Sequence, residues 1–211
     1  MIRLMVAGVI LGVAAFTVGM MIYIGNKRRD KSIDKLLQDD MVANFARSRD
    51  LEPEYFYTPD LSVLPIRDDA QNDILKKQSQ LVGTSNLRMV RFPQKMGNIE
   101  LKSKYGPANL EKIAGYEENY TRYISALLGW AEALLDHGGR QEKADAIAIL
   151  ENTVLLGSDY RKTYKLLADH YAGIANADGL NHLLDSVASA FEDEGIKRQL
   201  TQYIMDKKEN L

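Results

Sequence analysis

Hydrophobic positions divide the chain into three parts with different patterns. Residues 4–25 carry no charged side chain, residues 27–106 have short apolar stretches interrupted by proline, and residues 107–211 place apolar residues at three- and four-residue spacing. The last pattern is typical of amphipathic helices. We therefore predict an all-α protein with an N-terminal transmembrane helix in residues 1–26, a helical and extended juxtamembrane region, and a C-terminal domain of antiparallel helical hairpins.

The uncharged segment is long enough to cross a lipid bilayer. Its 22 residues read LMVAGVILGVAAFTVGMMIYIG. A helix of this length spans about 33 Å, and the hydrocarbon core of a bilayer is about 30 Å thick. A cleaved signal peptide has a shorter apolar region of about 7–15 residues followed by a small-x-small cleavage site. Because this segment continues directly into Lys27, Arg28 and Arg29, we favour an uncleaved anchor.

Basic residues on either side of the segment indicate its orientation. Only Arg3 precedes the segment, whereas five basic residues follow it closely: Lys27, Arg28, Arg29, Lys31 and Lys35. Lysine and arginine near a membrane span are retained on the cytoplasmic side. The sequence thus predicts a single-pass membrane protein with a cytoplasmic C-terminal domain.

Small residues recur along the predicted anchor. Gly8 and Gly12 form a GxxxG pattern, which Ala15 and Gly19 extend. Small residues four apart let two helix backbones approach closely, which favours a homodimer or a partner helix. The competing interpretation is that glycine is simply frequent in membrane helices.

The region after the anchor is predicted to alternate between helical and extended structure. Residues 27–50 have a helical pattern, and residues 68–81 form a second helical candidate that ends near Gly83. Between them, prolines interrupt the apolar segment 51–66, which indicates an extended chain lying against a helical surface. The helical pattern of the first stretch comes from Ile33, Leu36, Leu37, Met41 and Phe45.

The stretch between these helices and the C-terminal domain has a weaker pattern. Residues 89–93 are compatible with a short edge strand, and residues 96–98 with a turn. Basic residues alternate with apolar ones here, including Arg88 and Arg91. We interpret them as a solvated face rather than a nucleic-acid surface, since no aromatic stacking platform accompanies them in sequence.

Helices separated by short turns follow one another in the C-terminal half. Glycine, serine and asparagine mark the turns, with Gly138 and Gly139 between the first two helices. This order predicts helical hairpins in series. The predicted helices cover residues 107–135, 142–156, 160–174, 180–191 and 194–211.

Side chains within these helices have a repeated spacing of large and small residues. The spacing is seen at Tyr164, Leu167, Ala168 and Tyr171, at Leu127, Trp130, Ala131 and Leu134, and in the intervening helix at Ala146, Leu150 and Thr153. On these residues, segment 120–191 resembles two degenerate tetratricopeptide repeats, which are helical hairpins of 34 residues. An unrelated helical bundle with the same spacing is the alternative.

The resemblance carries two structural expectations. Ala131 and Ala168 are 37 residues apart rather than 34, so we expect Gly138 and Gly139 to lie in an enlarged turn. Because two repeats are fewer than the three that usually bury a continuous core, another segment must supply the missing layer. The preceding helix or segment 51–66 can do so, and residues 194–211 would then form a capping helix.

Composition and motifs give no support for catalysis. The chain has 27 basic and 29 acidic residues and no cysteine, which excludes disulfides, thiolate catalysis and cysteine metal sites and gives no global reason to bind nucleic acid. His137, His170 and His182 do not form an HExxH motif, and no phosphate-binding loop or nucleophile elbow is present. We therefore predict a protein that is not an enzyme, with no catalytic residue, metal or cofactor.

The resemblance implies a groove that binds an extended peptide or a partner helix. Its inner positions would be Lys162, Lys165 and Asp169 in the second hairpin, and Leu128 and Glu132 in the first. A solvated lysine face is the competing interpretation. We predict a membrane-anchored interaction module that recruits or scaffolds a protein partner. The alternatives are a permanent accessory subunit of a membrane complex and an outward-facing repeat protein of the cell envelope or of export.

Overall fold

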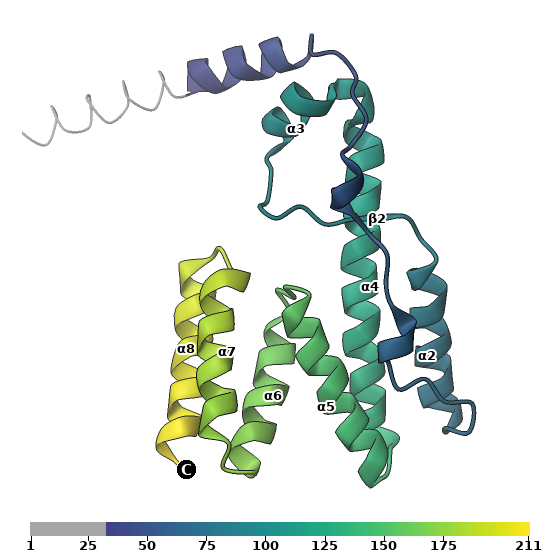
Figure 1. Ribbon diagram of the computed structural model, residues 1–211. Coiled ribbons are helices and arrows are strands. Elements are labelled where there is room, and N and C mark those ends of the chain that lie inside the picture. Colours follow the sequence, from purple (N-terminus) through teal and green to yellow (C-terminus); the bar gives the residue numbers. More distant parts are fainter. Residues whose placement is uncertain (1–32) are drawn as a thin grey trace, which may run out of the picture. The chain divides into compact units, whose positions relative to one another are not determined.

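The computed structural model describes residues 33–211 (Figure 1). Within this range the protein is all-α, as predicted, except for two strands of two residues each. None of the helices in the described range is both long and apolar enough to cross a membrane. The predicted anchor at residues 4–25 lies outside the described residues, together with its small residues Gly8, Gly12, Ala15 and Gly19.

Contacts group the chain into two compact units. The first comprises Met1–Leu51 and Phe92–Lys112, and the second comprises Glu52–Arg91 and Ile113–Leu211. Each unit is therefore built from two separate stretches of sequence. The juxtamembrane residues predicted as one region are divided between them.

The first unit joins a helix at residues 33–43 to helix α3, Asn98–Tyr105. Lys102 on α3 donates a hydrogen bond to Asp40, with 2.7 Å between Nζ and Oδ1. The side chains of Ala43, Leu101 and Tyr105 are buried. Tyr105 also stacks on Phe92, with ring centroids 6.3 Å apart.

In this unit one sequence prediction was wrong and one helix was not predicted. The helix expected over residues 27–50 ends at residue 43 in its described part, because the chain turns at residues 44–45 and then bonds to the end of α3. The amide of Arg49 donates to the carbonyl oxygen of Tyr105 at 3.0 Å. α3 itself was not predicted, and only a turn at residues 96–98 was expected, at the point where α3 begins. With only Leu101 and Tyr105 buried, its apolar pattern is too short to recognise.

Gly106, which ends α3, has a backbone conformation that only glycine adopts readily. Its φ is +82° and its ψ is 149°, outside the regions open to residues with a side chain. A Cβ atom at this position would lie 2.8 Å from the backbone nitrogen of Ser48. The neighbouring Asn109 side chain then fixes this approach by donating to Ser48 Oγ at 2.9 Å and to the Arg49 carbonyl at 2.8 Å.

The second unit contains most of the helices. A short ribbon pairs β1, Phe56–Tyr57, with β2, Met89–Val90, in antiparallel register. The same unit contains two short 3₁₀ helices, Pro53–Tyr55 and Leu61–Val63. A third, Pro107–Asn109, belongs to the first unit and directly precedes α4. The α-helices are α2, Asn72–Ser85; α4, Leu110–His137, whose first three residues belong to the first unit; α5, Arg140–Leu155; α6, Arg161–Gly173; α7, Ala177–Ala190; and α8, Glu194–Glu209.

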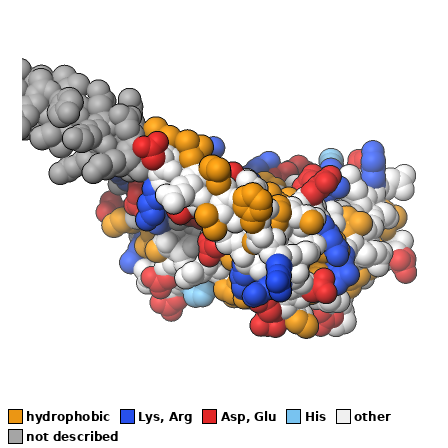
Figure 2. Space-filling view, turned by 90° about the horizontal axis from the view of Figure 1, so that it is seen from above, with side chains coloured by type: hydrophobic (Ala, Val, Ile, Leu, Met, Phe, Trp, Pro, Cys, Tyr) orange, Lys and Arg blue, Asp and Glu red, His pale blue; other side chains and the backbone are white. Residues whose placement is uncertain are grey.

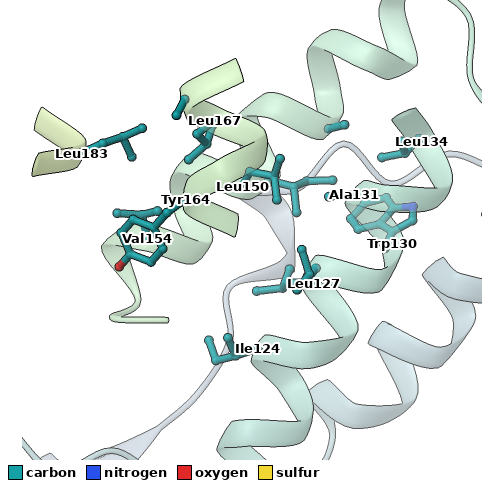
Figure 3. Close-up of a cluster of buried hydrophobic side chains, with 14 of the residues drawn as sticks. Ile124, Leu127, Trp130, Ala131, Leu134, Leu150, Val154, Tyr164, Leu167 and Leu183 are labelled. Atoms are coloured by element: carbon teal, nitrogen blue, oxygen red, sulfur yellow. The ribbon is translucent and has the colours of Figure 1, made fainter. Parts of the chain in front are cut away.

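Helices α4 to α8 form hairpins in series around one hydrophobic core. Figure 1 shows α5, α6, α7 and α8 following one another away from α4. Figure 3 shows Leu150 of α5 between side chains of α4, among them Leu127, and side chains of α6, among them Leu167. Tyr171 is half-buried, whereas the other residues that carry the repeat-like spacing are all buried: Leu127, Trp130, Ala131, Leu134, Ala146, Leu150, Thr153, Tyr164, Leu167 and Ala168.

Residues 52–91 supply a further layer against α4. The Tyr57 ring lies 5.2 Å from the Tyr120 ring and 6.0 Å from the Tyr123 ring, measured between centroids. The Tyr120 hydroxyl donates to the carbonyl of Leu156 at 2.6 Å, and burial raises the pKa of Tyr120 to about 12. At the other end of the series, α8 packs against α6 and α7. Both ends of the helical series are therefore covered by the chain itself.

Several helix boundaries differ from the predictions: α4 begins at Leu110 rather than at residue 107, α5 at Arg140 rather than 142, and α7 at Ala177 rather than 180. α2 was expected at residues 68–81 but begins at Asn72, because Gln78 binds both backbone groups of Arg67 and holds the preceding chain out of the helix. It also continues past Gly83 to Ser85. The enlarged turn expected at Gly138 and Gly139 was wrong: the turn is only these two residues long, since α4 ends at His137 and α5 begins at Arg140.

Candidate partner-binding surface

Two of the predicted partner-binding residues connect α4 to α6. The Lys162 ammonium group lies 2.8 Å from a carboxylate oxygen of Glu132. Lys162 is exposed to solvent and Glu132 is half-buried. The pair thus lies at the surface where the first helices of the two hairpins meet.

The other two charged residues of the set connect α6 to α8. Asp169 accepts a hydrogen bond from the Tyr203 hydroxyl at 2.7 Å and forms an ion pair with Lys207 at 2.6 Å. Lys165 places its ammonium group 5.1 Å from the centre of the Tyr203 ring, within range of a cation–π interaction. α8 is thereby attached to the same face of α6 that carries Lys162.

The Asp169 carboxyl group is held in its charged form. Burial alone would raise its pKa, but hydrogen bonds from Lys207 and Tyr203 and the positive charges of Lys207 and Lys165 hold the pKa below its ordinary value of 3.8. The same contacts also raise the pKa values of Lys207 and Tyr203. The hydrogen bond to Asp169 raises the pKa of Lys207, while burial and then Asp169 raise that of Tyr203.

We expect the Asp169–Lys207 pair to make stability depend on pH in the acid range. Because the pKa of Asp169 is lower in the folded chain than in the unfolded one, its contribution is fully present above about pH 4 and is lost as the pH falls through the folded pKa. Asp169→Asn should therefore destabilise the protein at neutral pH and approach the stability of the wild type in acid. Urea unfolding over this pH range measures the difference.

A second substitution identifies the cause of this dependence. Lys207→Met should reduce the pH dependence as Asp169→Asn does, since the lysine supplies the largest interaction that lowers the pKa. If Lys207→Met leaves the acid dependence unchanged, the ion pair is not its origin.

Leu128, the fifth predicted partner-binding residue, is buried in the core of the second unit. It therefore stabilises the fold and offers no surface to a partner. The four charged residues remain on the surface, already paired with one another or with α8.

Sequence reasoning missed an aromatic site around Arg88. The guanidinium carbon of Arg88 lies 4.1 Å from the centre of the Phe56 ring and 5.4 Å from that of Tyr116. These rings come from β1 and α4, so no local spacing in the sequence could reveal them. A shallow groove of about 500 Å³ lies beside them and is lined in part by Pro53, Thr58, Pro59, Ser85 and Asn86.

The helix at residues 33–43 leaves most of its apolar side chains exposed. Between this helix and α3 lies an open groove of about 1170 Å³, lined in part by Leu36, Val42 and Ile99. Figure 2 shows hydrophobic side chains at the surface where the described part of the chain begins. The periodicity of this helix was visible in the sequence, but its exposure was not.

Comparisons with known proteins found no relative of this chain. No protein family, no curated protein and no solved structure matches the chain. Among residues 33–211, no group of three histidine, aspartate or glutamate side chains is placed to hold a metal ion.

Proposed function

We propose that this chain is a single-pass membrane protein whose helical second unit binds a protein partner at the cytoplasmic face of the membrane. The anchor would be residues 4–25, and the five basic residues that follow support the cytoplasmic orientation. Anchoring raises the effective concentration of the helical unit toward other membrane proteins, so that weak binding gives useful occupancy. The proposed role is binding rather than catalysis.

The observation that carries this proposal is the charged face shared by α4 and α6. Its residues form ion pairs between helices at the surface, as in Lys162–Glu132. An exposed ion pair contributes only about 0–1 kcal/mol. A partner can therefore replace such a pair with its own charges at little loss of stability. Since both ends of the helical series are covered by the chain itself, this face is the surface we assign to the partner.

We further propose that the hairpins are of the tetratricopeptide type. The burial of Trp130, Ala131, Leu167 and Ala168 supports this assignment, because large and small residues at these positions pack the two helices of each repeat. The packing of α8 on α6 and α7 agrees with a capping helix.

Crosslinking in native membranes tests the binding surface. We expect a photoreactive residue at position 165 to give a defined crosslinked product. Lys162→Glu on the same chain should reduce the yield of this product about tenfold, because the new negative charge would repel an acidic side chain of the partner that binds Lys162. The matched control is Lys143→Glu, which changes an exposed lysine on α5 and should leave the yield unchanged.

The outcomes separate the candidate functions. A product that is insensitive to Lys162→Glu and copurifies with the chain in a one-to-one ratio would favour a permanent accessory subunit. A photoreactive residue placed at position 143 instead serves as a second control. If it gives the same products as the one at position 165, the charged face is not the binding surface.

Orientation is tested by protease protection on sealed membranes with an epitope after Leu211. We expect the epitope to be digested from the cytoplasmic face, because the basic residues that follow the anchor remain on that side. Protection would place the helical unit outside and make an envelope or export role the leading hypothesis.

A further inference from the structure

Four exposed apolar side chains form a stripe along the helix at residues 33–43 and the turn that follows it. We call Ile33, Leu37, Met41 and Phe45 the apolar stripe. Their exposed fractions run from 47% at Ile33 to 87% at Phe45. Residues four apart lie close together on one side of a helix. An apolar surface of this kind on a soluble helix marks a site that something else covers.

α3 already uses another side of this helix. Ala43 is buried, and Asp40 is bound by Lys102 of α3. The apolar stripe therefore cannot be explained by packing within the first unit.

The position of the stripe in the chain points to a lipid surface. Ile33 follows the last residue of the uncharged segment, Gly25, by only eight positions. Even a fully extended chain of that length spans at most about 29 Å. If residues 4–25 cross the bilayer, the stripe is thus tethered close to the membrane surface.

The net charges of the two units also favour an anionic membrane surface near the stripe, because the unit that contains the stripe is the positive one. Without Arg3, which the proposed anchor would place across the bilayer, the residues of the first unit include eleven lysines and arginines and seven acidic residues, a net charge of +4, whereas those of the second unit include fifteen and twenty-two, a net charge of −7. The helix itself carries Asp34, Asp39 and Asp40 against Lys35, and Asp40 is paired with Lys102. The basic residues that would attract an anionic surface are therefore those just before the helix, Lys27, Arg28, Arg29 and Lys31, with Asp30 as the only acidic residue in that stretch. Basic residues next to a membrane span attract anionic lipid headgroups.

We propose that the apolar stripe lies in the interface of an anionic membrane, with its side chains at the boundary between headgroups and acyl chains. This inference rests on the proposed anchor. It goes beyond that proposal by assigning a second lipid contact to the chain. The helix would then run along the membrane surface rather than stand in the solvent.

The absence of cysteine from the chain allows a direct test by single-site spin labelling. The full chain is reconstituted in vesicles of phosphatidylcholine with phosphatidylglycerol, and Met41→Cys carries the label. Leu155→Cys is the matched control, since Leu155 on α5 is apolar and exposed to a similar degree. Ala15→Cys reports separately on the anchor.

We expect the label at position 41 to be about tenfold less accessible to a water-soluble nickel complex than the label at position 155, and more accessible to oxygen, because an apolar side chain at the interface partitions into lipid. The protection should weaken in vesicles of phosphatidylcholine alone. Equal nickel accessibility at the two positions would overturn the inference. So would dipolar broadening at position 41 that disappears on dilution with unlabelled chain, because a second copy would then cover the stripe.

The label at position 15 separates the two proposals. If it lies in lipid while position 41 is in water, the anchor stands and the inference on the stripe fails. If position 15 is itself accessible to the nickel complex, the anchor fails, and with it the premise of the inference.

Discussion

Replacing Leu150 by alanine should lower the free energy of unfolding by about 3–5 kcal/mol. Leu150 is fully buried and lies between α4 and α6 (Figure 3). Its removal takes packing from both hairpins at once and leaves a cavity that helices on two sides cannot easily close. Urea unfolding followed by circular dichroism measures the loss. We expect the midpoint to fall with an unchanged slope, because the surface exposed on unfolding stays the same.

Leu155→Ala is the matched control on the same helix. Leu155 is 69% exposed, so its truncation should change the free energy of unfolding by less than about 0.5 kcal/mol. If the two alanine substitutions are equally destabilising, α5 does not present Leu150 to the core as described.

Replacing Gly106 by alanine should destabilise the first unit by about 3 kcal/mol. Residues with a side chain are strained at a φ of +82°, which contributes about 1–3 kcal/mol, and the new Cβ would also collide with the backbone of Ser48. The contact between α3 and residues 46–50 should open. Hydrogen exchange at the Arg49 amide, which is bound to the Tyr105 carbonyl, should therefore become faster.

For a glycine inside α4 we expect alanine to stabilise the protein rather than destabilise it. Gly115 is helical, and a Cβ built there would meet no neighbouring atom within 4 Å. Gly115→Ala should therefore stabilise the protein by about 0.5–1 kcal/mol through helix propensity. If Gly106→Ala is equally harmless, the close approach of Ser48 does not constrain the chain.

The hairpins of the second unit were predictable because their information is local and repeated. Apolar residues at three- and four-residue spacing persist over helices of 13–28 residues from α4 to α8. Glycine and asparagine mark the ends. α3 was missed for the converse reason, since a helix of 8 residues with two buried side chains gives too few periods to detect.

The site was predicted less completely because its contacts join distant parts of the sequence. Asp169 meets Lys207 across 38 residues, and Arg88 meets Tyr116 across 28. Spacing in the sequence placed Lys162 and Lys165 on one helix but could not show what lies opposite them. It also placed Leu128 on the binding face, although position along a helix alone does not reveal which of its sides the rest of the core covers.

The layer formed by residues 52–91 has a consequence for biosynthesis. Phe56 packs against Tyr116, and Tyr57 against Tyr120, so each aromatic residue leaves the ribosome about sixty positions before its partner. At about 5–20 residues per second, this interval lasts about 3–12 seconds. During that time the nascent segment has no helix α4 to cover its rings, and residues 4–25 have already been made. The second unit therefore completes its core only after α4 emerges, well after synthesis of residues 4–25, the longest uncharged segment of the chain.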